Sequence, residues 1–187
     1  MDLARESLDT KRKVLEHFTD QGLYPYSKFY LDDIRQGKGS YWANHFSTIG
    51  LIGMHECCLN YLGHGIETHQ GHEFAQRVLD HMRDRVASYQ EDNGSMYNLE
   101  ATPGEGTSYR LARLNRKEFP DIVCSGEEEP YYTNSTQLPV DATDDLFEAL
   151  THQDELQAKY TGGTVLHCFI GERIEDPEVC KKLVKKI

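Results

Sequence analysis

The chain has 187 residues, with 31 acidic and 20 basic side chains and a formal net charge of −11. Its length suits one domain with a sizeable core, and its 38% hydrophobic and 27% charged residues are ordinary for a soluble protein. The acidic balance argues against a nucleic-acid-binding surface, and no apolar run approaches the roughly 20 residues that span a bilayer.

The first forty residues are predicted to hold one clear helix. Residues 8–18 carry apolar side chains at helical spacing, and Gly22 ends this pattern. Pro25 fixes a turn into residues 26–34, and a flexible break over 37–40 follows.

The segment 46–62 is mostly apolar and is predicted to begin as a buried strand or loop and to continue as a helix. Gly50 and Gly53 would interrupt an exposed helix, so the change is placed between them. The clearest helix covers 72–89, where one stripe of apolar side chains predicts core packing: Phe74, Val78, Met82, Val86 and Tyr89.

The second half of the chain alternates between strands and helices. We expect strands over 97–102, 131–138 and 164–170, and helices over 107–115, 144–157 and from 176 or 177 onward. A helix opened by Gly162 and Gly163 is the alternative for the third strand. This alternation predicts an α/β fold, and without an internal repeat or linker, residues 1–187 are treated as a single domain.

Residues 96–110, Met-Tyr-Asn-Leu-Glu-Ala-Thr-Pro-Gly-Glu-Gly-Thr-Ser-Tyr-Arg, form the most informative stretch. They read as a strand, a glycine turn and a helix that Thr107 and Ser108 could cap. Gly104 and Gly106 allow a left-handed backbone or close approach to a ligand. Such a turn at a helix N-terminus is a natural phosphate site, although the pattern alone favours an ordinary strand–turn–helix connection.

Three further segments lie around this stretch: His-Phe-Ser-Thr-Ile-Gly-Leu-Ile-Gly-Met-His-Glu (45–56), Tyr-Tyr-Thr-Asn-Ser-Thr-Gln-Leu-Pro (131–139) and Tyr-Thr-Gly-Gly-Thr-Val-Leu-His (160–167). In this order, the four segments closely resemble the anaerobic ribonucleoside-triphosphate reductases, the glycyl-radical class of ribonucleotide reductase. The resemblance runs from about Leu23 through Ile187. It implies part of the ten-stranded α/β barrel shared by ribonucleotide reductases and pyruvate formate-lyase.

The resemblance also implies radical chemistry at the 2′ carbon of a ribonucleoside triphosphate. In the family, an activating enzyme that uses S-adenosylmethionine and an iron–sulfur cluster installs a glycyl radical, and formate or a dithiol supplies the reducing equivalents. The glycyl-radical segment, the zinc site of two Cys-x-x-Cys pairs, the thiyl-cysteine loop and the ATP-binding cone have no counterpart in these residues. We therefore expect the C-terminal part of a catalytic barrel, which works with the remaining parts of a homodimeric reductase.

Substrate holding is the role that the resemblance leaves to this sequence. The triphosphate is expected at the glycine turn, where backbone amides and hydroxyls are provided by Thr102, Gly104, Glu105, Gly106, Thr107 and Ser108. Glu105 is a physical objection, because a carboxylate beside an anion is unfavourable. Arg110 and Arg113 could offset it, or could equally be surface charges.

Other polar residues are secondary candidates. Glu100 and Asn98 share one side of a predicted strand and could act on the ribose or in formate-related chemistry, although a structural carboxylate is the commoner role. Asn134, Ser135 and Gln137 form a polar cluster, and Thr161, Gly162, Gly163 and Thr164 repeat the glycine-plus-hydroxyl pattern of a phosphate site. His167 is interpreted as a hydrogen-bonded core histidine.

Cysteine spacing gives no indication of a metal site. The five cysteines form no Cys-x-x-Cys pair, and their odd number suggests reduced thiols packed as small apolar side chains, among them Cys57 and Cys58. The start of the chain has no signal-peptide hydrophobic region, which predicts a cytoplasmic protein without a membrane partner. Three alternatives remain open: a substrate-binding part of the reductase, a truncated nucleotide-binding or structural module without catalysis, and a non-functional fragment whose exposed strand edges and apolar surface favour association.

Overall fold

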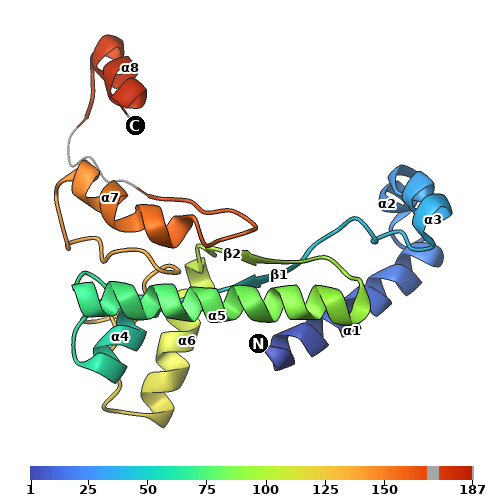
Figure 1. Ribbon diagram of the computed structural model, residues 1–187, viewed down its shortest axis with the longest axis horizontal. Coiled ribbons are helices and arrows are strands. Elements are labelled where there is room, and N and C mark those ends of the chain that lie inside the picture. Colours follow the sequence, from blue (N-terminus) through green and yellow to red (C-terminus); the bar gives the residue numbers. More distant parts are fainter. Residues whose placement is uncertain (168–172, 187) are drawn as a thin grey trace.

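The computed structural model describes residues 1–167 and 173–186 (Figure 1). Eight helices and two strands are assigned within these residues. In chain order they are α1 (Asp2–Asp20), α2 (Pro25–Tyr30), α3 (Asp32–Lys38), β1 (Ser47–Gly50), α4 (Met54–Leu62), α5 (His69–Asn93), β2 (Tyr97–Glu100), α6 (Glu105–Glu118), α7 (Leu146–Gln157) and α8 (Pro177–Lys186).

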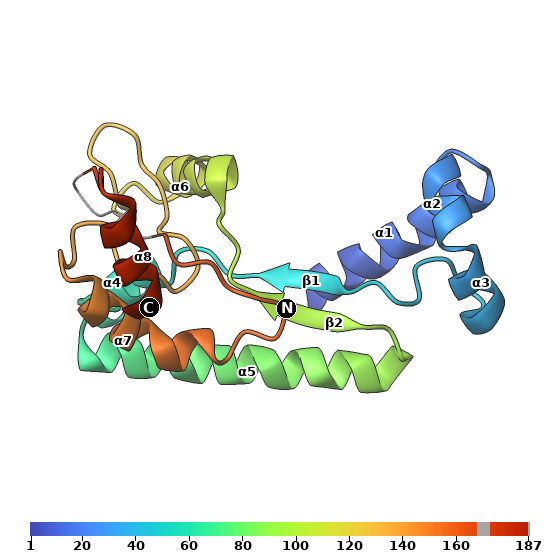
Figure 2. The same ribbon diagram turned by 90° about the horizontal axis from the view of Figure 1, so that it is seen from above.

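A two-stranded parallel sheet lies at the centre of the fold. β1 pairs with β2 in a register that joins Ser47 to Tyr97 and Gly50 to Glu100. Because parallel neighbours need a long crossover, α4 and α5 lie between the two strands in the sequence. The long helix α5 runs along one side of the sheet (Figure 2), and the alternate residues Ile49 and Leu99 are buried.

The core forms where α5 packs against the sheet and against α4 and α7. The predicted stripe on α5 is confirmed, because Met82, Val86 and Tyr89 are buried and Phe74 and Val78 pack against the same core. Thr68 caps the start of α5 by accepting a hydrogen bond from the Gly71 amide at 3.1 Å. Gly94, in a left-handed conformation, ends the helix.

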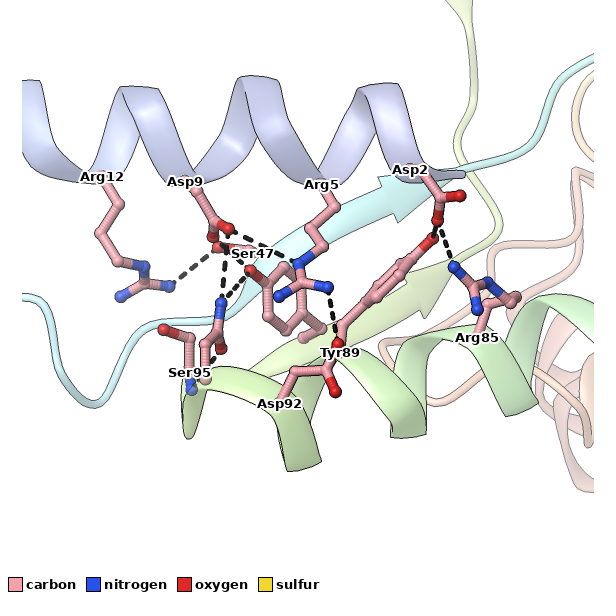
Figure 3. Close-up of polar contacts among 11 residues, drawn as sticks. Asp2, Arg5, Asp9, Arg12, Ser47, Arg85, Tyr89, Asp92 and Ser95 are labelled. Carbon is pink, nitrogen blue, oxygen red and sulfur yellow. Dashed lines mark hydrogen bonds and ion pairs between the residues drawn. The ribbon is translucent and has the colours of Figure 1, made fainter.

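Helix α1 extends away from the sheet but is bonded to it at several points. The Arg12 guanidinium donates to the carbonyl oxygen of His45 at 2.7 Å and to Oγ of Ser47, the first residue of β1, at 2.9 Å. Farther toward the N-terminus, the Arg5 guanidinium bonds Asp92 at the end of α5 at 2.8 Å (Figure 3). These contacts fix α1 against both the strand and the crossover helix.

Most predicted elements are present, with different ends. The change from strand to helix at Gly50–Gly53 is confirmed by β1 and α4, and the predicted helices over 8–18, 72–89, 107–115 and 144–157 correspond to α1, α5, α6 and α7. The terminal helix is also confirmed, as α8. Where a turn into 26–34 was predicted, two short helices, α2 and α3, form instead.

Two predicted strands are wrong within the described residues. The segment 131–138 makes only isolated bridges, Ser125 with Tyr131 and Ile52 with Asn134. Its other bonded backbone groups pair with the N-terminus of α4, with side chains or within the loop, and not with a neighbouring strand. Residues 164–167 are not in a strand either, and 168–170 of that prediction lie outside the described residues.

None of the helices within 1–167 and 173–186 combines the length and apolar character that crossing a membrane requires.

Close packing at Gly71 gives a test of this fold. A Cβ atom added there would lie 2.1 Å from the carbonyl oxygen of Gly65. We expect Gly71→Ala to lower the free energy of unfolding by about 1–3 kcal/mol, because backbone must move to accept the methyl group.

The matched control is Gly106→Ala, in another helix, where an added Cβ would meet no heavy atom within 4 Å. Its free energy of unfolding should change by less than about 1 kcal/mol. Urea titration measures both variants, and equal stabilities would contradict the packing described here.

Candidate functional site

A cavity of about 1060 Å³ lies between the start of α6, the loop 131–140 and the start of α7, with Leu183 of α8 at its wall. Its lining mixes aromatic, aliphatic and amide side chains. Lining residues that matter below are Glu105, Ser108, Asn134, Gln137, Asp144, Asp145, Gln153 and His167. From the predicted glycine turn, Glu105 and Ser108 line the cavity, whereas Thr102, Gly104, Gly106 and Thr107 are not part of its lining. Asn134 and Gln137 of the predicted polar cluster also line it.

The N-termini of α4 and α6 lie at the same edge of the sheet. Each helix follows the carboxyl end of one parallel strand, through a glycine with positive φ: Gly53 at 82° before α4 and Gly104 at 79° before α6. The carboxyl ends of parallel strands meet at one edge, which is where α/β proteins place ligands. The amides at the N-terminus of α4 are bonded to protein groups, whereas two amides at the N-terminus of α6 are free within the described residues.

Protein groups occupy the N-terminus of α4. The Gly53 amide donates to the Thr133 carbonyl at 2.8 Å, and the Met54 amide donates to the Ser135 carbonyl at 3.1 Å. In return, the Glu56 carboxylate accepts from the Thr133 amide at 3.0 Å and from its hydroxyl at 2.7 Å. The loop 131–137 is thereby fixed against α4.

The N-terminus of α6 opens on the cavity. Glu105 donates its amide to the Pro103 carbonyl at 2.9 Å, and Thr107 donates to the Gly104 carbonyl at 2.8 Å. Within the part of the chain that the structure describes, the amides of Gly104 and Gly106 have no hydrogen-bond partner. Of the backbone amides predicted to bind phosphate, these two are therefore free. A Cβ atom added at Gly106 would meet no heavy atom within 4 Å, so the space next to this residue is open.

The residues predicted to cap α6 have other roles. The helix begins at Glu105 after Gly104, so Thr107 lies within its first turn and is exposed. Ser108 is 4% exposed, and its hydroxyl donates to the Tyr132 carbonyl while accepting from the Tyr132 amide at 3.2 Å. The Ser108 side chain therefore holds the cavity wall in place. Thr102 precedes the turn, and a Cβ at Gly50 would collide with its hydroxyl at 1.7 Å.

The polar cluster of 134–137 divides between the cavity and the core. Asn134 and Gln137 line the cavity, and the Gln137 amide donates to the Val165 carbonyl at 3.0 Å. Ser135 instead bonds Tyr160 in the core, with 2.5 Å between the hydroxyl oxygens, and burial raises the pKa of Tyr160. Ser135 also has a positive φ of 45°, which is rare for a residue other than glycine.

The second predicted phosphate segment is part of the sheet edge. The amides of Thr161 and Gly162 both donate to the Leu99 carbonyl, at 3.0 and 2.8 Å, and the Gly163 carbonyl accepts from Ala101 at 3.0 Å. Thr164 has its hydroxyl buried. The amides of Thr161 and Gly162 are thus already bonded to β2, and the phosphate site at 161–164 stays a prediction.

Glu100 and Asn98 do not line the cavity. Both lie on the half-buried side of β2, with Glu100 opposite Gly50 in the register. The Asn98 amide lies against Gly162, where an added Cβ would be 2.6 Å from Nδ2. Its Oδ1 is buried without a hydrogen-bond partner in the described residues. Neither residue of this pair is therefore part of the cavity lining.

The electrostatics of the cavity are acidic. Among the described lining residues, Glu105, Asp144 and Asp145 are carboxylates and none is lysine or arginine. Arg110 and Arg113 are exposed and lie outside the lining, so their alternative reading as surface charges fits their positions. Within the described ranges, no three His, Cys, Asp or Glu side chains are grouped to hold a metal ion.

Two residues, His167 and Cys57, differ from their predicted environments. His167 is exposed and lines the cavity, so its interpretation as a core histidine is wrong, because the segment 164–167 is not a buried strand. Cys57 is exposed, whereas Cys58 is buried as predicted. Burial raises the pKa of the Cys58 thiol to about 11, which leaves it unreactive.

Sequence reasoning missed the apolar wall of the cavity. This wall includes Tyr109, Leu138, Val140, Leu146 and Phe147. These side chains come from a helix, a loop and a second helix, so no single periodic pattern marks them. The paired aromatics at 131 and 132, next to the predicted polar cluster, were the one local signal.

Two histidines, His72 and His152, link helix α7 to α5 and to the loop before it. His152 donates from Nε2 to the Ile66 carbonyl at 2.9 Å, and His72 donates from Nε2 to the His152 carbonyl at 2.9 Å. The next residue, Gln153, donates to the Thr136 carbonyl at 3.0 Å and lines the cavity. Burial lowers the pKa of His152, and the neighbouring His72 acts in the same direction.

This pKa shift predicts how stability depends on pH. As the pH falls below the ordinary value of 6.5, unfolded His152 binds a proton before folded His152 does, so the free energy of unfolding decreases. His152→Gln should reduce this loss of stability between pH 7 and pH 5. Urea unfolding at several pH values measures it, with the exposed His81→Gln as control. An identical pH profile in wild type and His152→Gln would contradict the assignment.

Comparison with known proteins identifies relatives of one kind. The family model described as anaerobic ribonucleoside-triphosphate reductase matches residues 1–187. The anaerobic ribonucleoside-triphosphate reductase of Haemophilus influenzae is 27% identical over 122 residues, which cover 64% of this chain and 17% of that protein. The Escherichia coli protein of the same name is 25% identical over 123 residues, with the same coverage.

Solved structures show the same fold. The anaerobic ribonucleotide reductase of Thermotoga maritima, crystallised with glycerol in the active site, has a TM-score of 0.74 at 24% identity. The match covers 99% of this chain and 29% of that one, so the predicted α/β fold as part of the reductase barrel is confirmed. The chain spans about 17% of the length of the curated relatives it matches. It belongs to the anaerobic ribonucleoside-triphosphate reductase family.

Proposed function

We propose that the chain is a substrate-binding part of an anaerobic reductase that converts ribonucleoside triphosphates to deoxyribonucleoside triphosphates. The main support for this proposal is the open N-terminus of α6. The Gly104 and Gly106 amides have no partner in the described residues, and the neighbouring Glu105 and Ser108 line a cavity of about 1060 Å³. Family membership over the whole chain supports the choice of ligand.

The triphosphate is proposed to bind with a phosphate at the α6 N-terminus. The amides of Gly104 and Gly106 would donate to its oxygens, and the positive end of the helix dipole would favour its charge. Asn134, on the facing loop, would add a donor through Nδ2. Glu105 opposes an anion, but its side chain is exposed, so water and salt screen the repulsion.

The radical chemistry is assigned to other parts of the reductase. We propose that the glycyl radical, the activating enzyme with S-adenosylmethionine and its iron–sulfur cluster, and formate or a dithiol act together with this chain in a homodimeric assembly. We also propose that zinc belongs to those other parts.

A cytoplasmic location is also proposed. The cysteines at 57, 58, 124 and 180 are free thiols, as is usual in a reducing compartment.

A second candidate is a nucleotide-binding or structural module without catalysis. The separation of Asn98 and Glu100 from the cavity favours it, since ligand binding at α6 then needs neither residue. The two candidates differ in turnover only.

Reconstitution distinguishes them. The chain is combined anaerobically with polypeptides that carry the remaining reductase segments and with the activating enzyme, and deoxyribonucleotide formation is measured. We expect turnover in the complete mixture and none from this chain alone. Nucleotide binding without turnover in the complete mixture would favour the second candidate, and turnover by the chain alone would contradict the division of roles.

The site itself is tested by Gly106→Val. A branched side chain above the free amide would exclude a phosphate oxygen, so triphosphate affinity should fall by about tenfold or more, which is about 1.4 kcal/mol. Calorimetric titration with CTP measures the affinity.

The matched control is Gly37→Val in α3. An added Cβ there also meets nothing within 4 Å, and Gly37 does not line the cavity. This variant should keep the wild-type affinity. Unchanged affinity in a folded Gly106→Val protein would place the phosphate elsewhere.

A further inference from the structure

We propose that Glu56 is a positioning residue for the nucleotide: it holds the loop 131–137 so that Asn134 faces the open N-terminus of α6. This inference rests on the proposed function. It assigns a role to a buried carboxylate that lies behind the cavity wall and is absent from the cavity lining.

Glu56 is buried and bonded entirely by neutral donors. Its side chain is 1% exposed. Both carboxylate oxygens lie 3.0 Å from the Thr133 amide nitrogen, and one accepts the Thr133 hydroxyl at 2.7 Å and the Ser125 hydroxyl as well. No lysine, arginine or histidine within the described residues forms an ion pair with it. Its place in the first turn of α4 favours a negative charge.

All three polar groups of Thr133 bond to α4 or to the glycine before it. The Gly53 amide donates to the Thr133 carbonyl, and the Thr133 amide and hydroxyl donate to Glu56. On the preceding residue, Tyr132, both backbone groups bond to the Ser108 hydroxyl of α6. Residues 132 and 133 are therefore fixed from two helices.

The orientation of Asn134 follows from this hold. Ser135, next in the chain, has a φ of 45°, a conformation that persists only when surrounding contacts impose it. Asn134 Oδ1 lies 3.3 Å from the position of a Cβ at Gly104, and the Asn134 side chain has no hydrogen bond among the described residues. Its carboxamide is thus held beside Gly104 through Oδ1, and its Nδ2 donors have no acceptor among the described residues, so they remain available to a ligand.

Replacing the carboxylate should release the loop. One Glu56 oxygen accepts all three donors, and the other accepts only the Thr133 amide, at 3.0 Å. In Glu56→Gln, the side-chain NH₂ group would replace the second oxygen and oppose the Thr133 N–H, so two buried donors face each other without an acceptor between them. The loop can relieve this contact only by moving, and Asn134 moves with it. The expected result is a loss of nucleotide affinity beyond any loss of stability.

The experiment measures CTP affinity of the full chain by calorimetric titration, together with the melting temperature. We expect Glu56→Gln to weaken CTP binding by about tenfold. The matched control is Glu16→Gln, because Glu16 of α1 likewise accepts the backbone amides of Tyr41 and Trp42, at 3.1 and 2.7 Å, but lies outside the cavity. That variant should lose stability and keep its affinity.

A double-mutant cycle separates positioning from general destabilisation. Asn134→Ala alone should weaken CTP binding, and adding Glu56→Gln to it should produce no further loss, because both changes remove the same contact. If Glu56→Gln prevents folding, Ser125→Ala removes one donor to Glu56 and should weaken binding by about twofold to threefold.

Unchanged CTP affinity in folded Glu56→Gln, or in Ser125→Ala where that variant replaces it, would overturn the inference. So would fully additive losses in the double variant. Absence of CTP binding by the wild-type chain would reject the proposed function and the inference together, whereas wild-type binding that is insensitive to Glu56 would reject the inference alone.

Discussion

The carboxyl-end edge of the β1–β2 pair determines what this chain can do. Parallel pairing brings two helix N-termini, those of α4 and α6, to one side of the sheet, and each presents amides that the helix itself cannot satisfy. The protein fills one of them with the carbonyls of Thr133 and Ser135. The other opens on the cavity. The loop 131–137, which bonds to the N-terminus of α4, also lines the cavity beside the N-terminus of α6. A change in this loop therefore affects both helix ends.

The described cavity lining contains carboxylates and lacks lysine and arginine. Under the proposed function, an anion would therefore be held by backbone amides, the Asn134 side-chain amide and the helix dipole. Such groups are fixed by the fold and do not need to be ordered when a ligand binds. The role proposed for Glu56 is to maintain their placement.

Sequence patterns predicted the elements that have strong periodicity or glycine punctuation. The apolar stripe of α5 and the glycines around β1 and α4 marked these elements correctly. The loop 131–138 misled the prediction, because its backbone bonds to the N-terminus of α4 and to the Ser108 hydroxyl of α6 instead of to a paired strand. For the site, the glycine turn was found at the cavity, but the roles of Ser108 and of 161–164 depend on partners 24 and about 62 residues away in the sequence. Local reasoning has no access to such partners.

The register between Ser47 and Tyr97 also constrains how the molecule assembles itself. The two strands are separated in sequence by the whole of α4 and α5, so they cannot meet until that intervening stretch has become compact. Pairing of these strands is the step that brings the N-termini of α4 and α6 to one edge of the sheet. The loop 131–137 can contact both helices only once that step is complete.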